Sequence, residues 1–375
     1  MQKKLIALAV ATLASGAVLA QSNVTVYGAI DVGYTNRGDA KIAPGHAKPG
    51  STNQINSGQS DTSKIGFTGV EDLGNGVKAL FVLEAGFYAD DGKINDQLFS
   101  EQAFLGLTGG FGTAIAGRLV APRHGFLASI DPFGAGTVGQ YRNVYSDSPV
   151  LGYAAWDPDR VDNAVAYVSP SFGGFNVTAA YATNAISQET AGNDGDFKTI
   201  AILPRYTNGP LDVGVSYQRI KNDAAIPLTP LADVKLTSLS VGASYDFKVV
   251  KVGAFYDQTK LDAGAPATAD GVKHKVWLVG VTVPFGKNAI QASYTQSKYD
   301  GWYDDDKARQ WAIGYTYALS KRTNFYAAYS DIKNDGVRNV GVDDASNNIG
   351  GIHDANDTRI GAYERGIQLG LKHTF

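Results

Sequence analysis

One stretch of the sequence has the spacing of a nucleotide-binding loop. Residues 134–139 read GAGTVG and match the pattern G-x-G-x-x-G. In dinucleotide-binding proteins this pattern follows a hydrophobic strand and opens a helix. Here SIDPF precedes the pattern and QYRNVYSDSP follows it, so neither flank fits. We therefore expect no nucleotide cofactor at this stretch.

Residues of hydrolytic and metal chemistry are present but form no known arrangement. His124 lies near Ser129 and Asp131 in the sequence, which does not by itself give the geometry of a catalytic triad. Neither G-x-S-x-G nor H-E-x-x-H occurs, and the 5 histidines have no metal-ligand spacing. Since an enzyme needs a nucleophile, a base and an orienting acid together, the sequence predicts no enzyme, no metal site and no cofactor.

One long segment, residues 119–159, combines charges of both signs with apolar side chains. Its bases are Arg123 and Arg142, and its acids are Asp131, Asp147, Asp157 and Asp159. Its larger apolar residues include Phe126, Leu127, Ile130, Phe133 and Val138. Because apolar side chains gain free energy when they leave water, we expect this segment to pack against the protein.

The first 20 residues have the pattern of a cleaved export signal. Lys3 and Lys4 precede an apolar run, and Val18 and Ala20 fit the small-residue site of signal peptidase. The alternative, a membrane anchor, would need about 20 apolar residues in succession. Without the two lysines, 31 of the 33 basic residues remain against 36 acidic ones, so the exported chain, residues 21–375, has a net charge of −5. That balance predicts no nucleic-acid partner.

Composition and periodicity predict an all-β chain. It has 44 Gly, 20 Tyr and 16 Phe beside 1 Met and no Cys, and glycine and aromatic residues are poor helix formers. No window after residue 20 approaches 18 apolar residues, which excludes spanning helices. Alternation of period two occurs instead in VTVYGAIDVGY (24–34), LDVGVSYQ (211–218), TSLSVGASYDF (237–247) and GIQLGLKHTF (366–375).

Short and long connections alternate along the chain. The short ones are tight-turn sequences at 71–76, 108–112, 171–174, 208–210, 285–288 and 320–322. The long ones are polar and rich in Asp, Asn and Gly, at 37–60, 185–197, 222–234, 261–273 and about 333–361. The strands between them number about 16, each long enough for a tilted crossing of a bilayer.

Alternating apolar and polar residues on successive strands predict a closed antiparallel barrel in a membrane. In hydrocarbon every backbone N–H and C=O must be paired, so strands cross only as a barrel without edges. The polar faces carry Gly, Ser, Thr, Gln and charge, which predicts a water-filled interior. Closure pairs the last strand with the first, and we expect Phe375 to join Phe247 and Phe285 in an aromatic girdle. The alternative is a soluble, adhesin-like β protein in which Phe375 ends a buried strand.

Several segments resemble the Gram-negative general porins, especially their β-proteobacterial branch. They are VTVYGAIDVGY, SKIGFTGVEDLGNGVKALFVLEAGF, EQAFLGLTGGFGTAIAGR, RVDNAVAYVSPSFGGFNVTAAY and GLKHTF, in this order. The resemblance implies a homotrimer of 16-stranded barrels, exported through the periplasm to the outer membrane, in which small solutes diffuse passively. It implies that the third loop, about 119–159, folds inward and that the barrel-assembly machinery reads Phe375 as an insertion signal. Charged external loops are expected to be solvated, with contact to lipopolysaccharide as the alternative.

The resemblance also assigns residues to the constriction of the pore. DPFG resembles the tip of the family's third loop and gives Asp131 the acidic side. The family has a basic ladder on the opposite wall, which Arg160 matches and where Lys64 takes a place usually held by Arg. Arg118 is expected to face the lumen in step with Gly112, Ala114 and Ala116. Strand parity also puts Glu101 in the lumen, where the family usually has Arg.

These charges predict weak ion selectivity. Arg123, Arg142 and the four acids of the third loop face three bases and Glu101 on the wall, and a ring with excess charge selects the counter-ion. We expect anions to be slightly favoured, as the resemblance implies. Three alternatives remain. The wall bases could lie outside the constriction, Glu101 could pair locally with Lys64 or Arg118, and Asp131 could be only a turn former.

A substrate-specific channel is the alternative function. It would use aromatic side chains of the third loop as a stacking track for a sugar or another nutrient, namely Phe126, Phe133, Tyr141 and Trp156. Saturable block of conductance by one solute would distinguish it from a diffusion pore.

Overall fold

A computed structural model gives the arrangement of most of the chain. It describes residues 23–42, 45–95, 97–145, 158–185, 197–222, 233–263, 271–301, 307–335, 340–341, 351–353 and 359–375. The expected export signal and the loop residues Asp147, Trp156 and Asp157 lie outside the described residues. What the sequence predicts for them stays a prediction.

The described residues form strands and two short helical segments. The strands are β1 (Asn23–Ile42), β2 (Thr52–Ser57), β3 (Lys64–Gly74), β4 (Val77–Gly86), β5 (Gln102–Gly109), β6 (Gly112–Val120), β7 (Arg160–Val168), β8 (Phe175–Ala182), β9 (Lys198–Asn208), β10 (Leu211–Asn222), β11 (Val234–Asp246), β12 (Lys251–Asp262), β13 (Lys273–Phe285), β14 (Asn288–Asp300), β15 (Lys307–Ala318), β16 (Thr323–Asn334), β17 (Gly351–His353) and β18 (Arg359–Thr374). The helical segments are α2 (Pro122–Ile130) and the 3₁₀ turn η1 (Tyr141–Tyr145). No helix in this part of the chain is long and apolar enough to cross a membrane.

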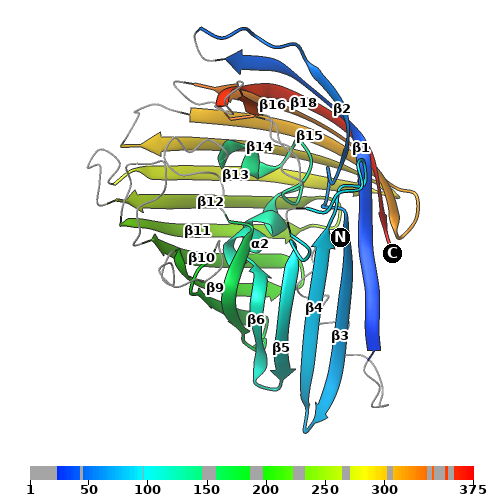
Figure 1. Ribbon diagram of the computed structural model, residues 1–375, viewed down its shortest axis with the longest axis vertical. Helices are drawn as coiled ribbons and strands as arrows, with labels where there is room; N and C mark the ends of the chain where they lie inside the picture. Colours follow the sequence, from blue (N-terminus) through cyan, green and yellow to red (C-terminus); the bar gives the residue numbers. More distant parts are fainter. Residues whose placement is uncertain are drawn as a thin grey trace.

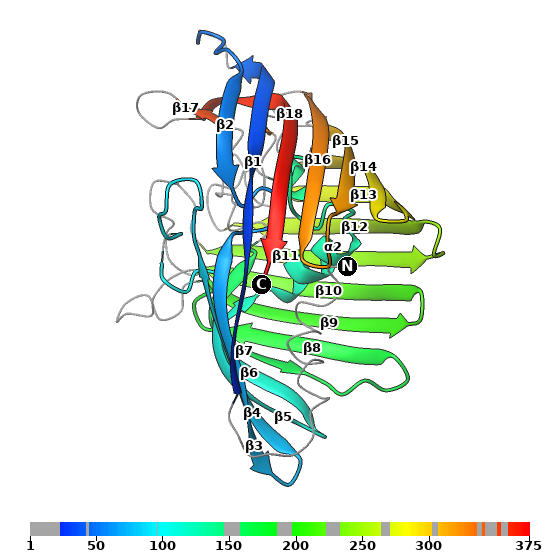
Figure 2. The same ribbon diagram turned by 90° about the vertical axis from the view of Figure 1, so that its right-hand side faces the viewer.

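The strands close into one antiparallel barrel (Figures 1 and 2). Neighbours in the chain pair with each other, and β18 returns to pair with β1 along most of its length. β2 and β3 pair with different halves of β1 and so share one position in the wall, and β17 is a three-residue addition at one end of β18. The 18 strands therefore fill sixteen wall positions, which confirms the predicted count.

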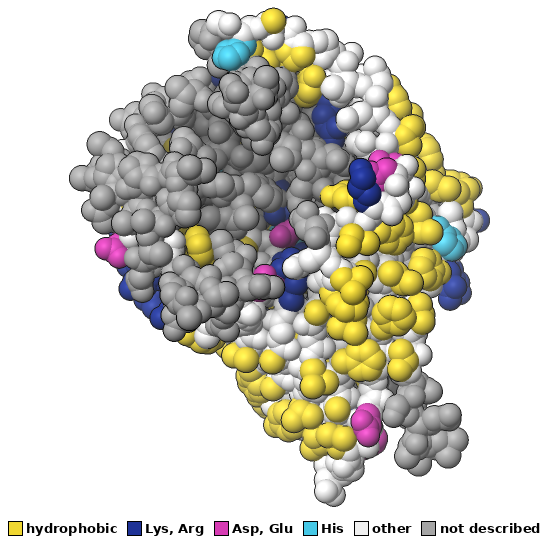
Figure 3. Space-filling view, in the orientation of Figure 1, with side chains coloured by type: hydrophobic (Ala, Val, Ile, Leu, Met, Phe, Trp, Pro, Cys, Tyr) yellow, Lys and Arg dark blue, Asp and Glu magenta, His cyan; other side chains and the backbone are white. Residues whose placement is uncertain are grey.

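The two faces of the wall differ as expected for a barrel in lipid. On β11, Leu239 and Val241 are 49% and 46% exposed, whereas Ser238 and Ser240 beside them are buried. The same alternation runs around the barrel, and Figure 3 shows apolar side chains spread over the outer face of β1 and β3 to β5. Polar residues therefore line the inside, which inverts the arrangement of a soluble protein.

The short turns and the predicted aromatic girdle lie at one end of the barrel. Tight connections join strands there at 75–76, 110–111, 209–210 and 286–287. Phe247, Phe285 and Phe375 end or follow strands at this end, and all three are exposed. Phe375 and Gly28 exchange two backbone hydrogen bonds of 3.1 Å, so the terminal residue takes part in closing the barrel.

Half of the predicted loop at 37–60 is strand. β1 continues to Ile42, and β2 covers Thr52–Ser57. β2 stays paired with β1, and the end of β1 stays paired with β18, because the ladder hydrogen bonds use backbone groups whatever the side chains are. Polarity therefore marks where the membrane band ends and not where strand pairing ends.

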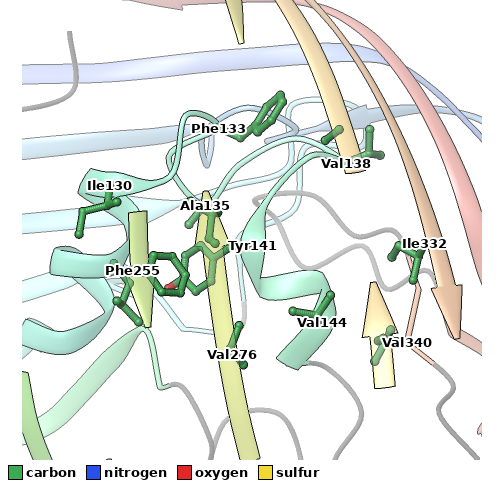
Figure 4. Close-up of a cluster of buried hydrophobic side chains, with 14 of the residues drawn as sticks. Ile130, Phe133, Ala135, Val138, Tyr141, Val144, Phe255, Val276, Ile332 and Val340 are labelled. Atoms are coloured by element: carbon green, nitrogen blue, oxygen red, sulfur yellow. The ribbon is translucent and has the colours of Figure 1, made fainter. Parts of the chain in front are cut away.

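The segment after β6 folds into the barrel and packs on its inner wall. α2 contacts β9 to β12, and η1 contacts β13 to β15. Figure 4 shows Ile130, Phe133 and Tyr141 of this segment in one buried cluster with Phe255 and Val276 of the wall. The rings of Tyr141 and Phe255 meet edge to face with centroids 5.3 Å apart. The apolar residues that the sequence singles out thus hold the loop against the wall.

Glycines on the inner face make room for the tip of this loop. A Cβ added at Gly242 would lie 2.4 Å from Ile130 Cδ1, and one at Gly280 would lie 2.4 Å from Pro132 Cγ. Real Cβ atoms do not approach other atoms this closely. The wall therefore lacks side chains on β11 and β13 where the loop passes.

Candidate pore constriction

Lys64 lies among carboxylates on the inner face of the wall. It begins β3, and its Nζ is 3.8 Å from Asp61 Oδ1 and 3.9 Å from Glu84 Oε1. The Glu84 carboxylate also accepts hydrogen bonds from Tyr27 Oη at 2.9 Å and Gln102 Nε2 at 2.7 Å. The predicted wall base is therefore held in a network that joins β1, β3, β4 and β5.

Glu101 and Arg160 form an ion pair. An Arg160 Nη contacts the Glu101 carboxylate, and Arg160 Nε donates to the Glu101 backbone carbonyl at 2.7 Å. Arg160 also lies 4.0 Å from Asp159, which pairs with Arg142 of η1 at 3.4 Å. Glu101 thus forms a local ion pair, as one of the alternatives predicted. Its partner, however, is Arg160 and not Lys64 or Arg118.

Lys372 and Asp61 also belong to this network, since Asp61 contacts both Lys64 and Lys372, although no motif in the sequence predicts a role for them there. Lys372 Nζ of β18 lies 2.5 Å from Asp61 Oδ2, in the connection before β3. Burial alone would raise the pKa of the Asp61 carboxyl, but Lys372 and Lys64 beside it hold that pKa well below its usual range. The sequence could have indicated Lys372 as a residue of the inner face, because strand alternation places it on the polar face of its strand together with Gln368.

Arg118 does not join this network through any contact among the described residues. One of its Nη atoms pairs with Asp162, and its Nε donates to the carbonyl of Ser100 at 2.8 Å. Arg118 therefore has an acid of its own, Asp162, although its acceptor Ser100 directly precedes Glu101, which Arg160 contacts.

Strand alternation was the wrong basis for placing Arg118 and Glu101. Ala114 and Ala116 are exposed, and Ala116 lies opposite the outward-facing Leu105, so regular alternation would turn Arg118 toward lipid. Regular pairing stops at Gly117, whose φ is 139°, and such a bulge redirects the neighbouring side chains. Glu101 precedes the first residue of β5, so the strand does not set its direction.

Arg123 fastens the third loop to the wall. It donates two hydrogen bonds to the Asp257 carboxylate of β12, at 3.0 Å and 2.7 Å, and both side chains are fully buried. A fully buried guanidinium that pairs with a carboxylate of the wall does not present an open charge to the pore. The pair instead joins α2 to the barrel.

Asp131 organises the backbone of the loop tip. Its carboxylate accepts N–H hydrogen bonds from Phe133, Ala135 and Tyr141, each at 3.1 Å, and only 4% of the residue is exposed. Burial raises the pKa of this carboxyl to about 6, although the three N–H groups favour its charged form. This geometry supports the turn-forming alternative over a place on the acidic side of the constriction.

Charges of both signs pair on this part of the inner wall and on the third loop beside it. We define the wall cluster by its bases, Lys64, Arg142, Arg160 and Lys372, and its acids, Asp61, Glu84, Glu101 and Asp159. Acids and bases alternate within it, in contrast to the expected separation of acids on the loop from bases on the wall. No group of three or more His, Cys, Asp or Glu in the described part of the chain is arranged to hold a metal ion.

Comparison with known proteins gives the class. A family model described as "Gram-negative porin" matches residues 7–337. The chain is 32% identical over 388 residues to outer membrane porin protein 32 of Delftia acidovorans, covering 100% of both chains. It is 33% identical over 380 residues to an outer membrane porin protein of Bordetella pertussis, covering 89% of this chain and 95% of the other. The structure of an anion-selective porin from Comamonas acidovorans superposes with a TM-score of 0.77, at 28% identity over 95% of this chain and 100% of that one.

The chain therefore belongs to the Gram-negative porin family. It is an outer-membrane β-barrel that forms a channel for passive transport, in agreement with its polar inner face and apolar outer face.

Proposed function

We propose that this porin is a weakly selective diffusion pore for ions and small hydrophilic solutes, slightly favouring anions and without catalytic activity. The observation that carries the proposal is the wall cluster, in which four bases pair with four acids. An ion passing paired charges meets a smaller net potential than an ion passing a ring of one sign. The likeness to a porin described as anion-selective supports the sign of the preference.

A substrate-specific channel has less support from the loop aromatics. Phe126, Phe133 and Tyr141 are at most 9% exposed and pack against the wall, so their faces do not line a path for a sugar. The fourth aromatic of the expected track, Trp156, lies outside the described residues. We therefore keep this channel type as the second candidate.

The proposal includes assembly as a homotrimer after removal of the export signal, insertion by the barrel-assembly machinery and contact with outer-membrane lipid and lipopolysaccharide. The outer face of β1 and β5 supports subunit contact, since Val24, Val26 and Leu105 are each more than half exposed. Exposed apolar surface of this kind packs against lipid or another subunit. The exposed ring of Phe375 is available as an insertion signal.

Swelling of liposomes that contain the purified porin tests the proposal. Entry rates of uncharged sugars should fall smoothly with solute size and rise linearly with concentration. Saturation, or block by one solute at low concentration, would instead favour the substrate-specific channel. Failure of every solute to enter would refute both.

A further inference from the structure

The inner face of β3 to β6 carries apolar side chains as well as charges. On β4, Leu80 and Val82 alternate in step with Glu84 of the wall cluster, so all three point into the barrel. Leu80 and Val82 are 5% and 3% exposed, and Phe104 of β5 lies opposite Val82. We define the apolar patch by five residues: Val70, Leu80, Val82, Phe104 and Ile115.

The patch is continuous across four strands. Val70 of β3 lies opposite Leu80. On the other side of Leu80 the opposed residue is Gly106, and Ile115 of β6 fills the space above it, since a Cβ at Gly106 would lie 2.5 Å from Ile115 Cγ2. Val70, Phe104 and Ile115 are partly exposed. The patch therefore offers an apolar surface to the lumen.

The patch faces the third loop across the pore. α2 and η1 pack on β9 to β15, and in the closed order of strands β3 to β6 lie across the barrel from β11 to β14 (Figure 1). Glu84 is two residues from Val82 on β4, which is a rise of about 7 Å toward the long loops. A solute that passes the wall cluster toward the short turns therefore meets the patch next.

Lys64 of the wall cluster has hydrogen-bonding capacity that the described residues do not use. The residue is 9% exposed, and its Nζ lies 3.8 Å from Asp61 Oδ1 and 3.9 Å from Glu84 Oε1. Both distances exceed the range of N–H···O hydrogen bonds, about 2.7–3.2 Å. A buried ammonium group, with its several N–H donors, gains free energy from an acceptor. The geometry fits a carboxylate that a passing solute brings.

The acids beside Lys64 decide which solute fits. A solute whose only charge is a carboxylate would be repelled by Asp61 and Glu84, which lie beside the same ammonium group. An α-amino acid brings a carboxylate for Lys64 and an ammonium group for the two acids. Its side chain then extends along the wall, and an apolar side chain leaves water when it reaches the patch.

We propose that Lys64, Asp61 and Glu84 bind the charged groups of an apolar amino acid whose side chain lies on the apolar patch. The inference rests on the proposed diffusion pore and names a class of solute whose passage is delayed there. Binding is weak, because the patch covers one side of the solute and leaves the other in water.

Single-channel currents of the full-length porin in planar bilayers test the site. Phenylalanine is compared with serine, which has the same charged groups without the apolar body, and with 3-phenylpropionate, which lacks the ammonium group. Phe104→Gln changes the patch and Lys64→Met changes the charged half of the site. The matched controls are Phe172→Gln, at a 70% exposed residue of a short turn, and Lys287→Met in another short turn.

Phenylalanine should interrupt the wild-type current at about tenfold lower concentration than serine, since its ring leaves water on the patch. 3-Phenylpropionate should act only at the concentration that serine needs. In Phe104→Gln and in Lys64→Met, phenylalanine should need about tenfold more than in wild type. Both controls should behave like wild type.

Equal action of phenylalanine and serine on the wild-type channel would overturn the proposal, and this comparison needs no variant to fold. Unchanged action of phenylalanine on either site variant would also overturn it. So would 3-phenylpropionate acting as strongly as phenylalanine, which would make an organic anion the ligand. Absence of any current in wild type would refute the pore and the site together, whereas a conducting channel without this preference would refute the site alone.

Discussion

At the scale of single residues, the pairing of Glu101 with Arg160 decides how much charge an ion meets. Replacing Glu101 by Gln removes one acid from the wall cluster and leaves Arg160 its weaker contact with Asp159. One unit charge about 6 Å away in water contributes roughly 0.7 kcal/mol, or about threefold in ion preference. We expect the reversal potential in a salt gradient to move toward anions by about this factor.

The control for this change is Glu71→Gln. Glu71 is exposed near the turn end of β3, away from the wall cluster. It should leave the reversal potential unchanged. A Glu101→Gln channel that behaves like the control would mean that ions do not pass near the cluster.

Titration of Asp131 makes the stability of the folded barrel depend on pH. Its pKa of about 6 in the folded barrel lies above the usual value of 3.8, so the folded state binds the proton more tightly than the unfolded state. The stability from this difference, about 3 kcal/mol, is complete below pH 4 and is lost as pH rises through about 6. Wild type should therefore gain thermal stability over Asp131→Asn between pH 7.5 and pH 5. Parallel melting curves of the two proteins across that range would contradict the assignment.

At the level of secondary-structure elements, the third loop can pack closely against the wall because the wall has glycines where the loop passes. α2 starts with Pro122 at its first position and ends where Asp131 begins the tip. The tip passes over Gly280 so closely that its Pro132 ring would meet any larger side chain. The glycines therefore set the distance between loop and wall.

Replacing Gly280 by Leu should push the loop tip toward the pore axis. Because the proline ring cannot turn aside, the loop has to move, and single-channel conductance should fall while the barrel still folds. Gly110→Ala is the control, since a Cβ there meets nothing within 4 Å. Wild-type conductance in Gly280→Leu would show that the loop tip does not border the pore.

How far the elements could be predicted depended on their periodicity. The strands were predicted well because each repeats the same alternation. α2 could not be predicted, since it has nine residues and is buried on several sides, so no amphipathic pattern marks it. The sequence did not predict the bulge at Gly117 either, because a glycine is compatible with both a regular and a bulged strand.

For the whole molecule, stability depends on closing the barrel between β18 and β1. Phe375 pairs with Gly28 through the backbone, and its ring covers that glycine, where a Cβ would lie 2.6 Å from the ring. Phe375→Ala should keep the backbone pairing but expose the seam, so the folded barrel should melt in detergent at a lower temperature. The conservative Phe375→Tyr should restore the wild-type temperature. Equal melting of all three proteins would show that the ring plays no part in closure.

Most of the architecture could be predicted at this scale, but the pairing of charges could not. Lys64, Glu101 and Arg160 were identified one by one; Glu101 pairs with Arg160, and the charges of both act on Lys64. Their partners come from distant parts of the chain, and Lys372 lies 311 residues from Asp61. Neither spacing nor alternation specifies which carboxylate each base contacts.

The central claim is that charges in the constriction cancel, so that the pore discriminates weakly between ions. The reversal potential of the wild-type channel in a potassium chloride gradient measures this directly. We expect a permeability ratio of less than about tenfold, with chloride slightly ahead. A ratio well above that, for either ion, would contradict the account.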